Sequence, residues 1–194
     1  MPNDLEADHS RIVNHVLAPP AGVFEIDPVH TFLGFSAQHL VVGRVRGHFS
    51  AVSGTVTIAD DPSASTVEVS VETASITTMA PIRDDDIRSE RYLDVKQYPA
   101  MVYRSTAVTE VPGGGWLVTG DLTLRNVTRP LELDVRFGGA VTDQFGNARL
   151  AFHASGSITR RDFGITNELL REAGGLLVGK DVAIDIDAEA IRPL

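Results

Sequence analysis

The side chains best suited to catalysis are three adjacent acids, Asp84 to Asp86, followed by Ser89. Together with a histidine, such an acidic cluster could serve a hydrolase or an isomerase. A serine nucleophile, however, needs a base within hydrogen-bond reach, and the chain contains no Gly-x-Ser-x-Gly segment. We therefore predict no enzymatic activity, and we keep catalysis at this acidic segment as the less favoured alternative to a solvated surface.

Metal-ligating residue types occur, but not with the spacing of known metal sites. The chain has no cysteine, and four of its histidines lack the short paired spacings of zinc sites: His30, His39, His48 and His153. The acids Asp84 to Asp86 are adjacent, whereas the ligands of an EF-hand calcium loop alternate with other residues. We predict no metal cofactor.

Most of the chain consists of short segments in which apolar and polar residues alternate. Clear examples are residues 33–39, 67–71, 116–124, 131–137 and 182–188. A period of two places alternate side chains on one face of a β-strand. The chain is therefore predicted to be all-β and antiparallel, with roughly eight strands that form two stacked sheets or a barrel filled by side chains or by a ligand.

Two segments interrupt this alternation. Residues 81–93 and 167–173 have the charge distribution or apolar spacing of short helices, and Gly174 would end the second one in the left-handed conformation. We expect both helices at the rim of the barrel, where either could cover an opening. Residues 1–21, which include Pro19-Pro20, are expected to form a flexible tether.

Length and charge narrow the class of protein. The 194 residues fit one domain, and a net charge of −9 argues against a nucleic-acid partner and against attraction to anionic membranes. The apolar stretches are far shorter than the ~20 residues that span a bilayer, so no stable membrane insertion is expected. Residues 1–21 lack the basic start and apolar core of a signal peptide, which predicts a cytoplasmic location.

Five groups of residues carry a family resemblance through their order and spacing. They are Phe24-Glu25-Ile26-Asp27 with His30-Thr31, Gly47-His48-Phe49, Asp84 to Asp94 with Tyr98-Pro99, Gly120 to Arg125, and Arg160 to Ile165. On these motifs the chain resembles the YceI-like family, also called polyisoprenoid-binding proteins, over residues 22–192. It departs from the family pattern at Asp86, where a histidine is usual, and at Asn126, where a glycine is usual.

The resemblance implies a lipocalin-like antiparallel barrel that encloses an isoprenoid or a similar amphiphile, such as a prenyl lipid, a quinone or a fatty amide. It implies carriage or storage without catalysis, commonly as a homodimer. Many members of the family are exported, in contrast to the cytoplasmic location expected here. A barrel packed solid with side chains, acting as a scaffold for a protein partner, remains an alternative.

Such a tunnel would bind a lipid chain through apolar contact alone. Burying one isoprene unit contributes about 3 to 4 kcal/mol, and a few units offset an association cost of about 4 to 15 kcal/mol. Inward-facing positions predicted to line the tunnel are Leu33, Phe35, Ala37, His39, Val67, Val69, Val71, Met101, Tyr103, Leu122, Leu124, Phe152 and Ile184. For each, ordinary core packing is the alternative.

A charged lipid head would need donors at the rim of the barrel. The candidate cations are Arg44, Arg46, Arg83, Arg88, Arg160 and Arg161. Arg88 and Arg160 lie within the family motifs and are the head-group candidates, although structural pairing with nearby aspartates is favoured for both. His39 and Tyr103 could each supply a polar contact inside the tunnel, and for His39 a satisfied hydrogen bond in the core is favoured.

Overall fold

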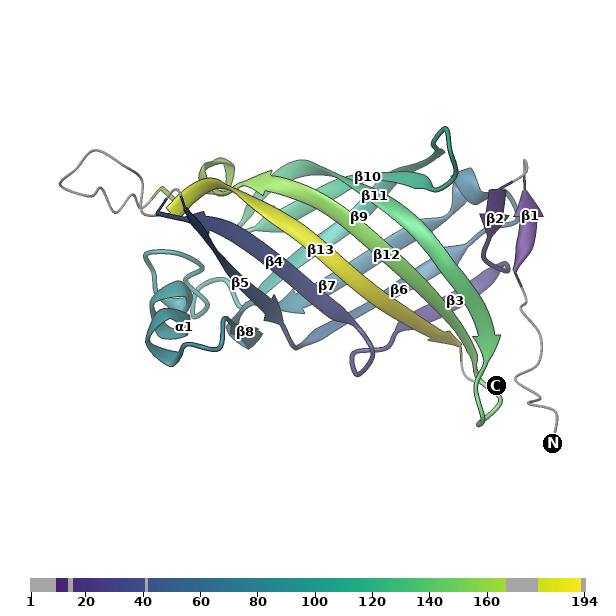
Figure 1. Cartoon of the computed structure of the whole chain (residues 1–194), viewed down its shortest axis with the longest axis horizontal. Coiled ribbons are helices and arrows are strands. Elements are labelled where there is room, and N and C mark those ends of the chain that lie inside the picture. The colour runs from purple at the N-terminus through teal and green to yellow at the C-terminus, as the bar shows by residue number, and fades with distance from the viewer. Residues whose placement is uncertain (1–9, 14–15, 41, 167–177, 193–194) are drawn as a thin grey trace.

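In the computed structural model, the described residues are 10–13, 16–40, 42–166 and 178–192. One large antiparallel sheet dominates them, as predicted (Figure 1). Its strands are β3 (Gly22–Ile26), β4 (Phe32–His39), β5 (Gly43–Phe49), β6 (Val52–Ile58), β7 (Thr66–Glu72), β8 (Ile76–Thr77), β9 (Ala100–Glu110), β10 (Trp116–Leu124), β11 (Val127–Thr142), β12 (Ala148–Thr159) and β13 (Val178–Arg192).

The sheet closes into a barrel. Starting at β12, the strand order is β11, β10, β9, β7, β6, β3 and β13, and a further pairing of β13 with β12 completes a ring of eight strands. This confirms the predicted eight-stranded antiparallel barrel. Closure also removes the exposed strand edges that an open sheet of this size would have to protect.

Two positions in the ring of strands are each occupied by two successive strands with a break between them. The long strand β13 pairs with β3 through Ala190 opposite Ile26, and with β4 through Ile184 opposite Phe35. In the same way β6 pairs with β3, while β5 pairs with β4. Strands β3 and β4 therefore occupy one position in the ring, and β5 and β6 occupy the next. The long strand β13 pairs with both β3 and β4 and so spans the break between them.

At one end of the barrel the sheet separates, and a helix lies in the gap. The β7–β9 pairing stops at Glu72 opposite Ala100, whereas β8 pairs with β5 at Phe49 opposite Ile76. The helix α1 (Pro81–Arg88) and the turns up to residue 99 lie between β8 and the start of β9 (Figure 1). One predicted rim helix is thus present, shorter than expected. The second, over residues 167–173, lies outside the described residues.

Among the described residues, short 3-10 helices lie in three of the connections: η1 (Pro62–Ala64), η2 (Thr73–Ser75) and η3 (Arg160–Phe163). The third ends at Gly164, whose φ of 74° is left-handed, and its amide donates to the carbonyl oxygen of Arg161. The motif Arg160 to Ile165 therefore forms a tight turn at the same end of the barrel as α1.

At the opposite end of the barrel, buried side chains pack against one another. They form a cluster from β3, β6, β11, β12 and β13: Phe24, Val56, Ile58, Ala140, Leu150 and Ala190. Of these, Phe24 and Ala190 are fully buried. We call this region the closed end, and the region around α1 the α1 end.

The described part of the predicted N-terminal tether is folded, contrary to expectation. Strands β1 (Arg11–Val13) and β2 (Val16–Ala18) form a hairpin at the end of the barrel opposite α1 (Figure 1). Ala18 is fully buried, and Nε of Arg11 donates to the carbonyl oxygen of Pro19 at 2.8 Å. Sequence patterns missed the hairpin because each strand has only three residues.

Candidate functional site

A cavity of about 900 Å³ lies inside the barrel. This volume is near the upper end of the range of roughly 300 to 1,000 Å³ typical of small-molecule sites. The barrel is therefore hollow along part of its length. Every residue predicted to line a tunnel does line this cavity: Leu33, Phe35, Ala37, His39, Val67, Val69, Val71, Met101, Tyr103, Leu122, Leu124, Phe152 and Ile184.

The lining follows from strand alternation. Along β10, alternate residues are buried, and those that line the cavity are Trp116, Val118, Leu122 and Leu124. Between the last two, Thr123 points outward, where its hydroxyl oxygen lies 2.8 Å from that of Thr128. Because the inward-facing positions of neighbouring strands lie side by side, the apolar side chains together form one apolar lumen.

The cavity is lined by more residues than the sequence predicted. Val118, Leu131 and Val182 extend its strand lining, and the same alternation could have identified them. Ile82 and Arg83 of α1 also line it. No periodic signal marks these two, because their contribution depends on how the helix sits in the gap between β8 and β9.

The side chain of Tyr103 is hydrogen-bonded to the backbone of the barrel wall. Its hydroxyl donates to the carbonyl oxygen of Val118 at 3.0 Å and lies 3.4 Å from that of Leu131. Gly120 permits this, because a Cβ there would lie 2.5 Å from the ring of Tyr103. Burial, and to a smaller extent the charge of Asp121, raises the pKa of Tyr103 to about 12. The phenol is therefore neutral and hydrogen-bonded before any ligand arrives.

Within the part of the chain that the structure describes, His39 is not a core histidine with a satisfied hydrogen bond, which is the interpretation that the sequence favours. It is half-buried at the end of β4, opposite Gly43 and Val178, and it lines the cavity. Its ring makes no hydrogen bond to any other described residue. An imidazole in this position can offer a donor or an acceptor to a molecule inside the barrel.

The two head-group candidates occupy different places. Arg160 lines the cavity and is 4% exposed, with Nε donating to the carbonyl oxygen of Gly179 at 2.9 Å and Nη1 to that of Ile165 at 2.8 Å. Burial lowers the pKa of this guanidinium, which nevertheless remains protonated. Arg88 does not line the cavity, and its Nε donates to the carbonyl oxygen of Ala74 at 2.9 Å. Arg88 thus connects α1 to the segment preceding β8.

The acids considered for catalysis stabilise the α1 end. Asp84 is 5% exposed and accepts hydrogen bonds from the amide of Thr78 at 2.8 Å and the hydroxyl of Thr77 at 3.1 Å. Burial alone would raise the pKa of Asp84, but these hydrogen bonds outweigh it and lower the pKa. Asp86 pairs with Arg91 at 3.1 Å. These contacts tie both acids to neighbouring segments around the helix, and Asp86 also lines the cavity.

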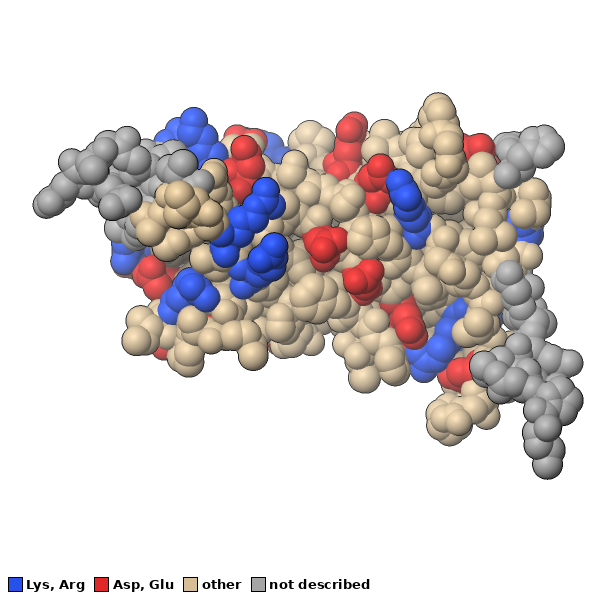
Figure 2. Space-filling model, viewed as in Figure 1, with Lys and Arg blue, Asp and Glu red and all other residues tan. Residues whose placement is uncertain are grey.

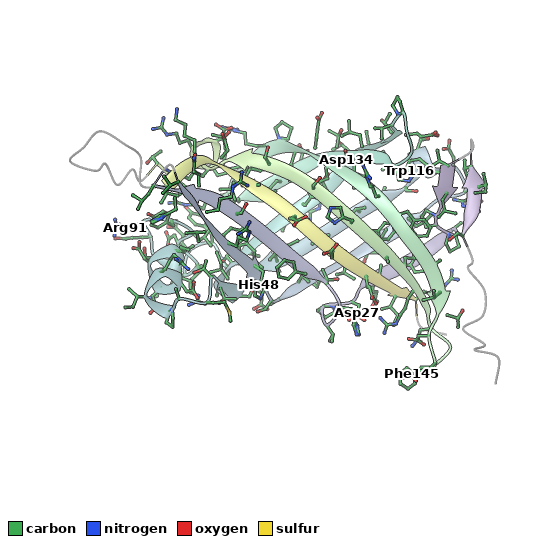
Figure 3. All side chains as sticks on the ribbon, viewed as in Figure 1. Asp27, His48, Arg91, Trp116, Asp134 and Phe145 are labelled. Atoms are coloured by element: carbon green, nitrogen blue, oxygen red, sulfur yellow. The ribbon has the colours of Figure 1, made fainter. Side chains whose placement is uncertain are left out.

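A second polar cluster lies at the break between β3 and β4, away from α1, where Figure 3 labels Asp27. Its acids are held by Arg149, whose Nη1 donates to Asp27 at 2.6 Å and to Glu189 at 3.0 Å, while Nε donates to Asp143 at 2.8 Å. Asp27 also lies 2.8 Å from Nδ1 of His30. Burial alone would raise the pKa of Asp27, but the hydrogen bonds from Arg149 and His30 lower it to about 2.

This cluster has metal-ligand atoms but not the electrostatics of a metal site. One ligand atom each from Asp27, His30 and Glu189 lies within 4.8 Å of the others. The guanidinium of Arg149 contacts both carboxylates and would repel a cation placed between them. We interpret the cluster as an ion-pair network that ties β3, β12 and β13 together at the closed end.

A closed antiparallel barrel with an apolar lumen places the chain in the class of lipocalin-like β-barrels. The YceI-like domain family model matches residues 24–190, so the chain belongs to the YceI-like family. A UPF0312 protein of Pectobacterium atrosepticum is 34% identical over 170 residues, which are 87% of this chain and 85% of the relative.

Solved structures share the fold. BcnA of Burkholderia cenocepacia matches with a TM-score of 0.71 and 18% identity over 84% of this chain and 98% of its own. A polyisoprenoid-binding domain of Saccharophagus degradans, described as implicated in plant cell wall breakdown, matches with a TM-score of 0.62 and 16% identity over 90% of this chain and 100% of its own. None of the helices in the described part of the chain has the length and hydrophobicity needed to span a bilayer.

Proposed function

We propose that this protein binds the hydrocarbon chain of an isoprenoid or similar amphiphile inside the barrel, for carriage or storage. The observation that carries this proposal is the apolar cavity of about 900 Å³ lined by inward-facing strand residues. Membership of the YceI-like family and the likeness to a polyisoprenoid-binding domain agree with it.

The apolar lumen is sufficient to hold such a chain. Each buried isoprene unit contributes about 3 to 4 kcal/mol, so three or four units contribute roughly 10 to 15 kcal/mol before costs. Association and ordering cost about 4 to 15 kcal/mol, which leaves net binding for longer chains. We propose that the length of the lumen selects the chain, and that the predicted lining residues contact it.

Polar groups in the cavity wall would then contact the other end of the amphiphile. Our candidates are the ring of His39, which is free of other described partners, and the guanidinium of Arg160. Arg160 already donates to backbone oxygens, so we expect it to provide positive charge more than new hydrogen bonds. Arg88 is the weaker candidate, since it does not line the cavity.

Filling the lumen tests the proposal directly. Leu122→Trp places a larger side chain in the cavity, whereas Thr123→Trp places the same side chain on the outer surface one residue away. Uptake of a fluorescent prenyl lipid, measured by titration, is expected to be lost in L122W and retained in T123W. Equal uptake by the two variants would contradict binding in the lumen.

A second experiment separates lipid carriage from a scaffold. Native mass spectrometry of the purified protein, followed by organic extraction, is expected to show a bound amphiphile that is absent from L122W. A parent protein that carries no amphiphile and takes up neither prenyl lipids nor quinones would favour the scaffold. The homodimer and the cytoplasmic location stay predictions, to be checked by light scattering and by cell fractionation.

A further inference from the structure

We infer that the α1 end of the barrel docks on an anionic phospholipid bilayer, with the mouth of the cavity facing the lipid surface. An amphiphile would then enter the lumen through this mouth, which rests on the proposed function. Docking depends on three features of this end, namely exposed aliphatic side chains, a fixed backbone that presents them, and unpaired cations.

Aliphatic side chains protrude on two flanks of the α1 end. Met79 and Ile82, at the start of α1, are 86% and 90% exposed, and Val42, in the β4–β5 turn, is 92% exposed. Ile82 also lines the cavity, so the lumen reaches the surface beside it. On the other flank, His39 and Val45 line the cavity on either side of the turn that carries Val42.

The flank that carries Met79 and Ile82 is held in a defined shape. Met79 has a left-handed φ of 61°, and its amide donates to the hydroxyl of Thr77 at 3.2 Å. Nε of Arg83 donates to the hydroxyl of Thr78 at 2.6 Å, and Nη2 donates to the Thr78 carbonyl oxygen at 2.9 Å. Asp84 holds Thr78 from the inside. These apolar side chains are therefore exposed by a rigid turn, so binding them orders little of the chain.

The net charge of −9 does not describe every part of the barrel surface. Figure 2 shows several basic side chains at the α1 end with a few acidic ones among them, and acidic side chains along a diagonal across the middle of the face with further basic ones beside them. At the α1 end, Arg44, Arg46 and Arg83 are exposed and make no ion pair with any described residue. The helix acids Asp85 and Asp86 are paired with arginines of their own segment.

An anionic bilayer fits these features better than a second copy of the chain. A copy would bring its own basic rim against the first, and like charges facing each other oppose association. A bilayer with anionic lipids attracts exposed arginines and accepts short aliphatic side chains at the headgroup boundary. The net charge of −9 is a sum over the whole chain and does not exclude attraction at a rim that carries Arg44, Arg46 and Arg83.

Vesicle co-sedimentation tests the inference. The full chain is expected to bind vesicles of phosphatidylcholine mixed with phosphatidylglycerol, to bind phosphatidylcholine vesicles much more weakly, and to dissociate in high salt. The double variant Met79→Ser with Ile82→Ser is expected to bind the mixed vesicles about tenfold more weakly.

The matched control is Val29→Ser with Phe145→Ser, which removes two side chains that are 82% and 74% exposed elsewhere on the barrel. Figure 3 shows Phe145 at the end of the barrel opposite the one where Arg91 lies, beside α1. The control variant is expected to bind mixed vesicles as the parent does. Equal binding by both variants, no dependence on anionic lipid, or absence of vesicle binding would each overturn the inference.

Two further measurements separate the possible failures. Light scattering at several concentrations is expected to give the same mass for the parent and the M79S/I82S variant; a loss of dimer in that variant with unchanged vesicle binding would instead make this face an interface between copies. L122W is expected to retain vesicle binding while it loses lipid uptake. Uptake without vesicle binding would therefore leave the proposed function standing and refute the docking surface alone.

Discussion

The two ends of this barrel use the same alternating strands for opposite purposes. At the closed end, inward-facing side chains such as Phe24 and Leu150 meet one another and leave no described residue of that cluster more than 8% exposed. Toward the α1 end, residues such as Leu122 and Ile184 face a cavity instead. The packing and ion pairs of the closed end stabilise the fold, so the rest of the lumen can present apolar surface to a ligand.

The largest expected effect separates the two regions by the same substitution. Leu150→Ala leaves a new cavity in a packed cluster and is expected to lower the free energy of unfolding by about 3 to 5 kcal/mol. Leu122→Ala only enlarges an existing cavity, and is expected to cost about 2 kcal/mol, because its side chain lacks packing partners on one side. Urea denaturation of both variants checks this. Equal losses would mean that the lumen is packed as tightly as the closed end.

The ion pairs of the closed end should make the free energy of unfolding depend on pH. The pKa of Asp27 is lowered from 3.8 to about 2 in the folded chain. Its contribution to stability is therefore fully present above about pH 4, the pKa of an unfolded aspartate, and is lost as pH falls through about 2. The midpoint of urea unfolding, measured from pH 7 downward, is expected to fall over that acidic range.

Arg149→Gln sharpens the same test. The variant removes the donor shared by Asp27, Asp143 and Glu189, and is expected to lose about 1 to 3 kcal/mol at pH 7. Its stability should then depend less on pH in the acidic range, because Asp27 and Asp143 each lose one of the hydrogen bonds that lower their pKa values. An unchanged pH profile would show that other groups control acid unfolding. Lipid uptake at pH 7 is expected to remain, since Arg149 does not line the cavity.

Tyr103→Phe tests a hydrogen bond in the barrel wall and is expected to have a smaller effect. The variant loses the hydroxyl that donates to the Val118 carbonyl oxygen, and the expected cost is about 0.5 to 1.5 kcal/mol in the free energy of unfolding. Lipid uptake should be unchanged, because that hydroxyl is already committed to the backbone. A loss of uptake with unchanged stability would show that the Tyr103 hydroxyl donates to the ligand instead of to the backbone.

The smallest effect on stability is expected at the mouth. Ile82→Ser changes a side chain that is 90% exposed, and its effect on the free energy of unfolding should stay within about 0.5 kcal/mol. Thermal unfolding checks this value. A larger loss would mean that Ile82 packs against the helix, and would remove the contrast between a stabilising closed end and an exposed rim.

The strand positions of the lumen were predictable from sequence because one local rule, the period of two, decides which face each side chain occupies. Val69 and Leu124 were assigned to the interior in this way, and both line the cavity. The family motifs added the barrel topology. Nothing local, however, states whether an inward-facing side chain meets another or faces a void, because that depends on strands far apart in the sequence.

The rim was predicted less well for the same physical reason. The helix near residue 81 was expected from its charges, but the cavity contacts of Ile82 and Arg83 depend on the separation of β8 from β9. The ion pairs of Arg149 join residues up to 122 positions apart. The hairpin of β1 and β2 was missed because three-residue strands carry too little pattern to distinguish them from a loose segment.

The double pairing of β13 has a consequence for how the protein moves. Its first half holds β4, next to the mouth, and its second half holds β3, at the closed end. We therefore expect the mouth to widen when β4 and β5 separate from β13, while the remaining ladder stays intact. Amide hydrogen exchange along this one strand should then be fastest near Val178 and slowest near Ala190.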